Sequence, residues 1–453
     1  MINWQQFGLR SNPYDTNPIT EGGELPIDQA FVGRKAEIKT IQDVFLSDSR
    51  ACLAILGNVG VGKTSLANYS KYILKSGKKG KILFSFRREM EASKNLLNKR
   101  NFLIEIIGST LREIKLLDPD LIKKEELLQK LGKIVDITQS MDISVGVSIA
   151  GFGGEYAKHS TTEYPSALSM SMLEGCFFDL ITYVKSHKIG GKVYSGLIVH
   201  VNNFDVVLSD KANRKSVLDF FQEIRDILQT KDVYFMFLGP SNFYQDVLSR
   251  EPRVKSVFHL TPMTLSPLTK KEVVKALEER ITILKSNDVV VPIQPVNDEV
   301  IYKLYDLYNG DVRSIMTGLT SILSQVSETI IEPLGTEEAL LLLGKERWES
   351  LKMTPGLTNE KEEILKFIAG SGNLVTVKEI IERFKKAPAN ISGYYFAPLK
   401  DAGIIEVKKT EGKTKYWGLT QTYEPIRYLL QSRESIQSRT ENDLKQLQLF
   451  NSK

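Results

Sequence analysis

Cysteine is nearly absent from this chain: Cys52 and Cys176 are the only two among 453 residues. Two cysteines are far too few for a disulfide framework, and they give no support for a structural zinc site, so a reducing cytoplasm is expected. Long hydrophobic runs are also missing, because residues 51–56 and 235–238 fall far short of the roughly 20 residues of a membrane helix. The start of the chain has no basic run followed by an apolar core, which argues against a secretory signal.

Positive charge is only slightly in excess, with a net charge of +5. The excess lies in the last part of the chain, where residues 351–453 contain 17 Lys and Arg against 12 Asp and Glu. Such a surplus fits a nucleic-acid contact in that part, and a solvated surface is the alternative. A chain of this length is expected to form two or three domains, each with its own core.

Apolar strands alternate with helical patterns through the first half of the chain. A buried strand at residues 51–56 leads into the glycine-rich stretch GNVGVGKTS, a helix, and a second strand at residues 81–86. Two further apolar strands, at residues 197–201 and 233–238, have a helical pattern between them. This βαβ alternation predicts a parallel sheet covered by helices, an αβα sandwich.

The stretch GNVGVGKT matches the P-loop pattern G-x-x-x-x-G-K-[ST] and lies after a buried strand and before a helix, as the pattern requires. In such a loop, backbone N–H groups surround the phosphates, the lysine reaches the β and γ phosphates, and the hydroxyl joins Mg²⁺. Lys63 and Thr64 are the residues for these roles, so ATP or ADP with Mg²⁺ is the expected ligand. The complete predicted nucleotide-binding set is Gly57, Asn58, Val59, Gly60, Val61, Gly62, Lys63, Thr64 and Ser65.

Three helical patterns near the C-terminus precede two strands. The helices are expected at residues 359–369, 376–386 and 390–403, and the strands flank a Glu-Gly turn within residues 404–419. Three helices followed by a basic hairpin predict a winged helix, a variant of helix-turn-helix.

This winged helix offers two sets of candidate DNA contacts. Its third helix contains Tyr394 and Tyr395 as exposed candidates, beside Ser392 and Lys400, and Pro398 interrupts the helix. The wing contains more lysines than the third helix, and lysines suit contacts with phosphates. The wing candidates are Lys408, Lys409, Lys413 and Lys415.

Four stretches resemble motifs of AAA+ ATPases of the origin-recognition and replication-initiator type. FVGRKAEI resembles the motif that precedes the P-loop, and FLGPSN resembles the strand end that carries a polar sensor. REPRVKSVF resembles the arginine-finger motif, and NGDVRSI resembles the sensor-2 motif. The resemblance covers about residues 31–419 and implies an AAA+ core, a helical lid and a C-terminal winged helix. A shorter likeness, FGLRSNPYD, is similar to the start of secretion and transposition ATPases.

The resemblance also implies roles for four residues. Asn242 is the sensor near the γ-phosphate, and Arg313 on the lid touches the γ-phosphate of the chain's own nucleotide. Arg253, with Arg250 as the second candidate, reaches the nucleotide of a neighbouring chain, which implies a homo- or hetero-oligomer. The alternatives are that the arginines are ordinary surface cations and that Asn242 only caps the following helix.

The strand at residues 197–201 ends where an AAA+ ATPase carries Asp-Glu. In the family the Asp holds Mg²⁺ through water and the Glu polarises the attacking water. Asn202 and Asn203 occupy these places in this chain. An amide lacks negative charge and cannot act as a base, so we expect ATP binding with slow or absent hydrolysis. Asp205 is the remaining acid of the stretch and the alternative catalytic candidate.

Composition shifts and motifs together predict five parts of the chain. A hairpin with alternating Ile and Val is expected around residues 142–160, either as a protruding loop that touches DNA or a partner, or as a structural ladder. The predicted parts are an N-terminal arm (1–30), an AAA+ core (31–265) with an insertion at about 100–165, a helical lid (266–350), a winged helix (355–425) and a tail (426–453).

These observations lead to one preferred function and two alternatives. The preferred function is an ATP-dependent switch that binds double-stranded DNA and assembles into oligomers, similar to replication initiators. The first alternative is a signalling or antiviral-defence ATPase that holds nucleotide as a latch and uses the winged helix for protein contacts. The second alternative is a regulatory ATPase of a mobile element. No membrane contact is expected.

Overall fold

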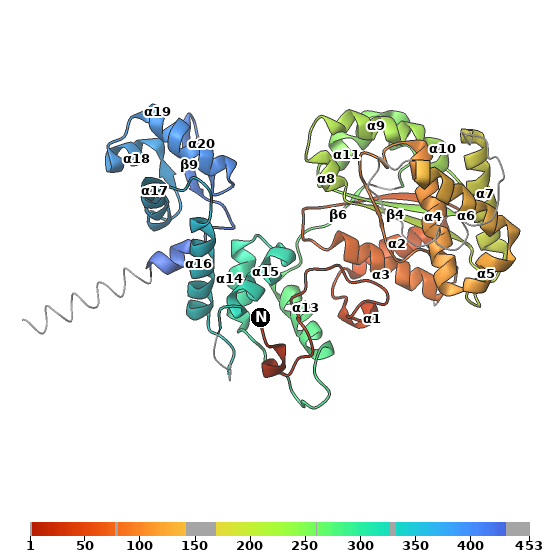
Figure 1. The fold of residues 1–453 in the computed structure, drawn as a ribbon, viewed down its shortest axis with the longest axis horizontal. Helices are drawn as coiled ribbons and strands as arrows, with labels where there is room; N and C mark the ends of the chain where they lie inside the picture. The colour runs from red at the N-terminus through yellow and green to blue at the C-terminus, as the bar shows by residue number, and fades with distance from the viewer. Residues whose placement is uncertain (1, 78–79, 142–168, 260, 327–331, 432–453) are drawn as a thin grey trace, which may run out of the picture. The chain divides into compact units, whose positions relative to one another are not determined.

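The computed structural model describes residues 2–77, 80–141, 169–259, 261–326 and 332–431 (Figure 1). The chain forms two compact units, Asn17–Pro267 and Met1–Thr16 together with Leu268–Lys453. The predicted N-terminal arm is therefore divided between the two units. The hairpin predicted around residues 142–160 lies outside the described residues. Of the helices in the described ranges, none is long and apolar enough to cross a membrane.

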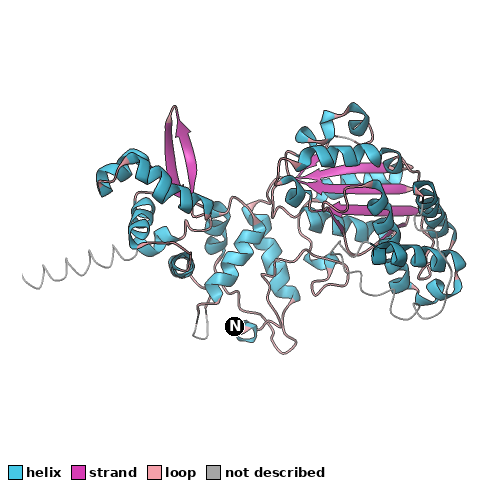
Figure 2. Cartoon of the chain, turned by 45° about the horizontal axis from the view of Figure 1, so that its top comes forward, coloured by secondary structure: helices cyan, strands magenta, loops and turns pink. Residues whose placement is uncertain are grey.

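A parallel sheet forms the centre of the unit Asn17–Pro267. Its strand order is β2-β4-β5-β1-β6, with β3 beside β4. Helices lie on both sides of this sheet in Figure 2. This parallel sheet with flanking helices matches the AAA+ α/β fold, so the predicted fold class is confirmed. The strands are β1 (Ala51–Leu56), β2 (Leu83–Ser85), β3 (Met90–Glu91), β4 (Gly196–Asn202), β5 (Val233–Gly239) and β6 (Met263–Thr264).

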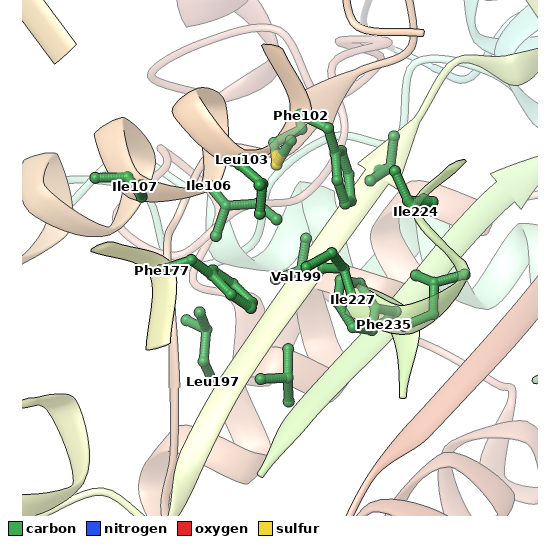
Figure 3. Packing of buried hydrophobic residues seen from close by; sticks show 14 of the residues in the cluster. Phe102, Leu103, Ile106, Ile107, Phe177, Leu197, Val199, Ile224, Ile227 and Phe235 are labelled. Atoms are coloured by element: carbon green, nitrogen blue, oxygen red, sulfur yellow. The ribbon is translucent and has the colours of Figure 1, made fainter. Parts of the chain in front are cut away.

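Residues of the central strands alternate between two cores, as a sheet buried on both faces requires. Val199 of β4 and Phe235 of β5 face one core, together with Phe102 and Phe177 from the covering helices (Figure 3). Their strand neighbours belong to the core on the opposite face, which includes Tyr234. Because both faces are covered, the strands read as continuous apolar runs in the sequence.

The helices of this unit include the one predicted after the P-loop and the helical segments predicted between β4 and β5. Residues 119–124 and 126–141 form two separate helices, with Glu125 between them. The helices are α1 (Ile27–Ala30), α2 (Lys35–Ser47), α3 (Lys63–Ser76), α4 (Lys99–Leu117), α5 (Pro119–Lys124), α6 (Glu126–Met141), α7 (Met170–Ser186), α8 (Phe204–Leu208), α9 (Asn213–Glu223), α10 (Arg225–Leu228), α11 (Phe243–Asp246), η2 (Leu248–Arg250) and α12 (Pro252–Lys255).

The second unit starts with a helical lid that also includes the N-terminal residues. Thr269 and Glu272 form a capping box at the start of α13, and Asp311 caps α15 through the backbone N–H of Arg313. Each cap satisfies N–H groups that a helix start leaves without partners. The elements are η1 (Trp4–Phe7), α13 (Lys270–Ile283), α14 (Asp298–Leu307), α15 (Val312–Leu323) and α16 (Thr336–Lys352).

The C-terminal subdomain combines short helices with an antiparallel sheet of order β7-β9-β8. These are the elements that the winged-helix prediction requires, in the predicted order. Pro398 does not break the third helix, because it lies in the first turn of α20, directly after the π-helical segment η3. The elements are α17 (Asn359–Gly370), β7 (Val375–Thr376), α18 (Val377–Phe384), α19 (Pro388–Asn390), η3 (Ile391–Phe396), α20 (Ala397–Asp401), β8 (Ile405–Glu411) and β9 (Thr414–Leu419).

Candidate nucleotide site

The loop between β1 and α3 is built around three glycines with positive φ, Gly57 (154°), Gly60 (79°) and Gly62 (89°). Other residues avoid such backbone angles, so the path of this loop depends on glycine. At Gly57 a Cβ would also lie 2.9 Å from Val61 Cγ2 and 3.0 Å from Leu265 O. Gly62 is the N-cap of α3, and its Cβ position has nothing within 4 Å. This open space lies at a helix N-terminus, where backbone N–H groups favour a phosphate.

Lys63 is the first residue of α3, and its ammonium group is held by three oxygens. Lys63 Nζ donates to Gly57 O at 2.9 Å, to Asn58 O at 3.1 Å and to Asp205 Oδ2 at 3.1 Å. The Lys63 side chain is 7% exposed. Asp205 comes from the first turn of α8, the short helix that follows β4, so this helix brings a carboxylate to the P-loop.

The two asparagines differ in their surroundings. Asn202 ends β4, is 7% exposed, and donates from Nδ2 to Thr64 Oγ1 at 2.9 Å. The structure thus brings Asn202, which we predict to occupy the acid position of the family pattern, into contact with the predicted metal-binding hydroxyl. Asn203 has a φ of 65°, the left-handed region that Asn tolerates better than most residues. Asn203 therefore has a backbone role at the start of α8, which the sequence pattern alone did not indicate.

Two oxygen atoms of the P-loop site suit a Mg²⁺ ion. Among the described residues, no group of three or more His, Cys, Asp or Glu side chains is placed to bind a metal ion. Mg²⁺ in nucleotide sites is commonly held by one or two protein oxygens together with phosphates and water. Thr64 Oγ1 fits this need, and so does Asp205 Oδ1, which is buried and has no hydrogen-bond partner within the described chain. Bound Mg²⁺ would neutralise phosphate charge at these side chains.

Two residues at and after the end of β5 contact the P-loop: Gly239 O accepts from Gly57 N at 3.3 Å, and Ser241, one position before the predicted sensor, uses its side chain. Ser241 Oγ donates to Asn58 Oδ1 at 3.0 Å. Asn242 is exposed, and its Nδ2 donates to Asp246 Oδ2 at 2.7 Å. The Asn242 side chain makes no capping bond to α11, although it occupies the N-cap position. Its role as a sensor stays a prediction, and Ser241 joins the candidates.

Arg34 is a site residue that the sequence analysis did not single out. Its guanidinium donates to Val61 O at 3.0 Å and to Ser266 O at 2.5 Å, and it pairs with Glu37 at 3.1 Å. Arg34 therefore fixes the middle of the P-loop to the segment after β6. The signal was present, because Arg34 lies in the FVGRKAEI stretch that resembles the family motif.

Glu91 is a second carboxylate near the end of β4. In the parallel register Glu91 of β3 is the partner of Asn202, and Met90 is the partner of Val201. Met90 and Val201 share one core, so Glu91 and Asn202 face the other side of the sheet. Glu91 is exposed, and within the described chain it forms no ion pair. No motif in the sequence indicated this pairing, because it follows from the register of the sheet.

The three predicted arginines are all exposed. Arg250 lies in η2 and Arg253 in α12 of the core unit. Arg313 is the second residue of α15, in the other unit. In the part of the chain that the structure describes, no carboxylate lies within ion-pairing distance of any of these three guanidinium groups. Each is available for an anionic ligand, and each assigned role stays a prediction.

The DNA candidates of the C-terminal subdomain fall into two groups. Lys413 and Lys415 are exposed and form no ion pair with another described residue. Lys408 Nζ instead pairs with Glu406 at 2.7 Å and with Glu424 at 3.6 Å, and Lys409 pairs with Glu411. The wing charge is therefore partly neutralised within the protein.

The two tyrosines of the third helix also differ. Tyr394 is 54% exposed, as predicted. The expectation that Tyr395 is exposed is wrong, because Tyr395 is only 3% exposed and belongs to the core of the subdomain. Its hydroxyl donates to Glu360 Oε2 at 2.5 Å, and this hydrogen bond raises the pKa of Tyr395. The π-helical winding of η3 shifts the helix faces relative to those of a regular α-helix, which explains the error.

Comparisons with known proteins found distant similarities. No family model matches the chain. A curated relative from Methanocaldococcus jannaschii, described as an uncharacterized HTH-type transcriptional regulator, is 25% identical over 426 residues and covers 91% of each chain.

Two solved structures from Aeropyrum pernix are also similar, each at 15% identity. The ORC1 protein in complex with DNA has a TM-score of 0.43 and covers 92% of this chain and 97% of its own. The ORC2 protein in ADPNP and ADP complexes has a TM-score of 0.44 and covers 93% of this chain and 100% of its own. At this distance, the assignment of the fold rests on the strand order and the P-loop of the chain itself.

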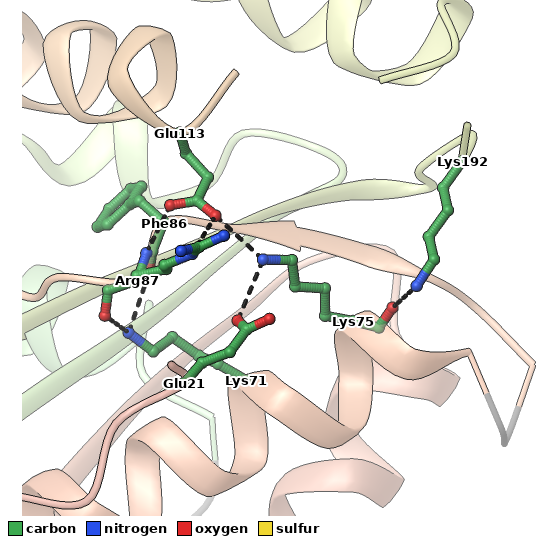
Figure 4. Close-up of polar contacts among 7 residues, drawn as sticks. All are labelled: Glu21, Lys71, Lys75, Phe86, Arg87, Glu113 and Lys192. Carbon is green, nitrogen blue, oxygen red and sulfur yellow. Dashed lines mark hydrogen bonds and ion pairs between the residues drawn. The ribbon is translucent and has the colours of Figure 1, made fainter. Parts of the chain in front are cut away.

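Buried charges fix α3, the helix behind the P-loop, to the rest of the core. Glu113 of α4 pairs with Lys75 at 3.0 Å and with Arg87 at 3.3 Å (Figure 4). Lys71 donates to the carbonyl oxygens of Phe86 and Arg87, at 3.1 and 3.2 Å. Burial lowers the pKa of Lys71 to about 8, although nearby carboxylates oppose the shift.

A neutral histidine lies in β4. His200 is fully buried, and neither ring nitrogen has a hydrogen-bond partner within the described chain. Burial, with a smaller contribution from the charge of Lys71, holds the pKa of His200 well below its ordinary value. His200 is therefore part of the buried interior of the core unit.

Proposed function

We propose that this chain is an ATP-binding AAA+ switch that associates with DNA and hydrolyses ATP slowly or not at all. The observation that carries the proposal is the contact between Asn202 and Thr64 beside a complete P-loop. Nucleotide binding is supported by the glycine loop and by Lys63 and Thr64 at the start of α3. The two acids that the family uses for hydrolysis are replaced by amides.

Binding and hydrolysis depend on different groups in this site. Binding uses the N–H groups at the start of α3 and the charge of Lys63, which leaves its three oxygens to reach a phosphate. Hydrolysis needs a base or a polarising acid near the attacking water, and such a group typically contributes 10²–10⁴-fold. Asn202 and Asn203 supply neither, so the proposal predicts tight binding with little turnover.

A catalytic role for Asp205 would contradict this proposal. Its Oδ2 is engaged with Lys63 in the structure, and its Oδ1 lacks a partner within the described chain. If nucleotide draws Lys63 away, Asp205 gains a free carboxylate next to the site. We propose that Asp205 holds Lys63 in the absence of nucleotide and contributes little to hydrolysis.

The test compares ATP binding with ATP turnover in the wild type and in Asp205→Asn, a variant that keeps the shape of the side chain. We expect both proteins to bind ATP and both to turn it over very slowly. Rapid wild-type turnover that is lost in Asp205→Asn would contradict the proposal and make Asp205 the catalytic acid.

DNA association is the second part of the proposal. It is supported by the two wing lysines that form no ion pair with a described residue, by the exposed Tyr394, and by the description of the Methanocaldococcus relative as an HTH-type regulator. Contacts with phosphates of this kind give binding that weakens steeply with salt. Absence of DNA binding at low salt with ATP present would favour the alternative in which the subdomain contacts proteins.

Assembly into oligomers is the third part. Arg250 and Arg253 are exposed on the core unit without ion pairs among the described residues, as residues that reach a neighbour's nucleotide would be. Sedimentation with and without ATP tests this part. We expect larger species with ATP in the wild type and fewer in Arg253→Ala, and a monomer under both conditions would contradict it.

A further inference from the structure

The N-terminal residues are an integral part of the lid core. Phe7 and Leu9 are fully buried and Tyr14 is 1% exposed, in the same cluster as the buried residues of α13 and α15. The ring of Trp4 lies 6.0 Å from the rings of both Phe7 and Tyr14. Removal of these side chains would therefore open the lid core as well as shorten the chain.

Backbone hydrogen bonds fix the same residues to the end of α13 and the loop that follows. Gly8 has a φ of 70°, and a Cβ at this position would lie 2.7 Å from Val289 Cγ1, so only glycine fits. The bonds run from Arg10 N to Leu284 O at 2.9 Å, from Ser286 N to Gly8 O at 2.9 Å, and from Ile293 N to Phe7 O at 3.0 Å.

Arg280 of α13 anchors the last residues of this segment. Arg280 is 6% exposed, and its guanidinium donates to Asp15 O at 2.7 Å and to Pro13 O at 3.3 Å. The same nitrogen lies 3.6 Å from Met316 Sδ, on the helix that carries Arg313. A buried cation is costly unless it is paired or hydrogen-bonded, so these carbonyl groups and Arg280 hold each other in place.

A few residues further on, the chain is anchored again, now to the core unit. Asn68 is 3% exposed, and its Nδ2 donates to Ile19 O at 3.1 Å. Glu21 pairs with Lys75 at 3.1 Å (Figure 4). Asn68 and Lys75 both lie on α3, the helix that begins with Lys63.

We propose that residues 15–19 form a strap, a second covalent connection that limits the movement of the lid unit relative to the core. The chain leaves one unit between Thr16 and Asn17 and returns between Pro267 and Leu268. From the Arg280 anchor at Asp15 to the Asn68 anchor at Ile19, a fully extended chain spans at most about 14 Å. The strap thus joins α3, the P-loop helix, to α13 over a short length. The inference goes beyond the proposed function, because it holds with or without nucleotide.

The test lengthens the strap and leaves every anchor intact. About twelve Gly and Ser residues inserted between Thr16 and Asn17 add roughly 20 Å of flexible reach. The control carries the same insertion after Gly412, in the turn between β8 and β9. Spin labels at the exposed positions of Ser216→Cys on α9 and Lys303→Cys on α14 report the distance between the units by pulsed EPR, without nucleotide and then with ATP. Both native cysteines are buried.

We expect the strap insertion to widen the distance distribution about twofold and the control insertion to leave it as in the wild type. An unchanged distribution in the strap variant would overturn the inference. A second variant, Arg280→Met, keeps all peptide bonds and removes the lid anchor. Arg280→Met should widen the distance distribution less than the insertion does. If Arg280→Met fails to fold, the insertion variant alone tests the strap. ATP binding by the wild type and by the strap variant is measured separately. It tests the proposed function and does not test the strap.

Discussion

The P-loop and the wing both present lysines that we assign to phosphate contacts, but the two regions hold these lysines in opposite ways. Lys63 is 7% exposed and is held by three oxygens at a helix N-terminus. Lys413 and Lys415 are exposed and form no ion pair with a described residue. In our proposal, the P-loop would bind phosphate with a preorganised lysine and backbone N–H groups, whereas the wing would bind DNA with solvated lysines that salt screens.

This difference explains why the sequence specifies one site more sharply than the other. A lysine in a P-loop has its position set by the glycine backbone and the helix that follows. A lysine on an exposed hairpin is free to pair with a nearby carboxylate, as Lys408 and Lys409 do. Three predictions, from the largest expected effect to the smallest, test the contrast.

The largest effect is expected at Lys63. Lys63→Ala removes charge-assisted hydrogen bonds to phosphate, each about 1.5–3 kcal/mol, so ATP affinity should fall at least about a hundredfold. Isothermal titration calorimetry measures the loss. The control is Lys63→Ala combined with Asp205→Asn, which removes the carboxylate that would otherwise be left unpaired. We expect the double variant to recover stability without recovering affinity. Recovery of affinity would mean that the charge of Asp205, and not the loss of Lys63, weakened binding.

A smaller effect is expected at the wing. Lys413→Ala with Lys415→Ala should weaken DNA binding about tenfold at low salt and lower the salt slope by about 0.9 for each phosphate that the variant no longer neutralises. Fluorescence anisotropy over a series of salt concentrations measures both quantities. Lys408→Ala with Lys409→Ala changes the net charge by the same amount and is the matched control. Equal losses of affinity in the two double variants would show that only the overall charge matters and that no individual wing lysine binds DNA.

The smallest effect is a decrease in the free energy of unfolding at low pH. The pKa of His200 in the folded chain lies well below the ordinary 6.5, so below that pH the unfolded chain binds a proton that the folded chain does not. The free energy of unfolding should therefore fall as the pH drops, by about 1.4 kcal/mol per unit once the unfolded histidine is protonated. In His200→Leu this contribution disappears. Denaturant unfolding at pH 7 and pH 5.5 gives the free energy of unfolding of the wild type and of His200→Leu. The same decrease in both proteins would rule out His200 as its cause.

The acid effect should also be confined to one unit. All four histidines of the chain lie before residue 260, so the unit that includes the wing contains none. A matching acid loss in the wing unit would require another group and would weaken the contrast between the two regions.

Much of the fold was predictable from local patterns. Strands buried on both faces read as apolar runs, and the P-loop glycines mark the turn from β1 into α3. The C-terminal helices and hairpin also followed from periodicity and from the Glu-Gly turn. These features depend on neighbours in the sequence, which is why the sequence was sufficient for them.

Other features depend on contacts between distant residues, and the sequence did not reveal them. Asp205 reaches Lys63 across 142 positions, and Arg280 reaches Asp15 across 265. The position of Glu91 beside Asn202 follows from the register of the sheet. The error at Tyr395 has a local cause, because the π-helical turn changes which side chains face the core.

The most direct test of the central claim is the turnover of bound ATP in the wild type and in Asn202→Asp with Asn203→Glu. Single-turnover measurements with excess protein separate hydrolysis from binding and product release. The account predicts that both proteins bind ATP, and that the variant hydrolyses it at least about a hundredfold faster because it regains an acid and a base. The claim is that Asn202 and Asn203 allow ATP binding and keep hydrolysis slow. Rapid hydrolysis by the wild type would contradict it, and so would a variant that hydrolyses ATP no faster than the wild type.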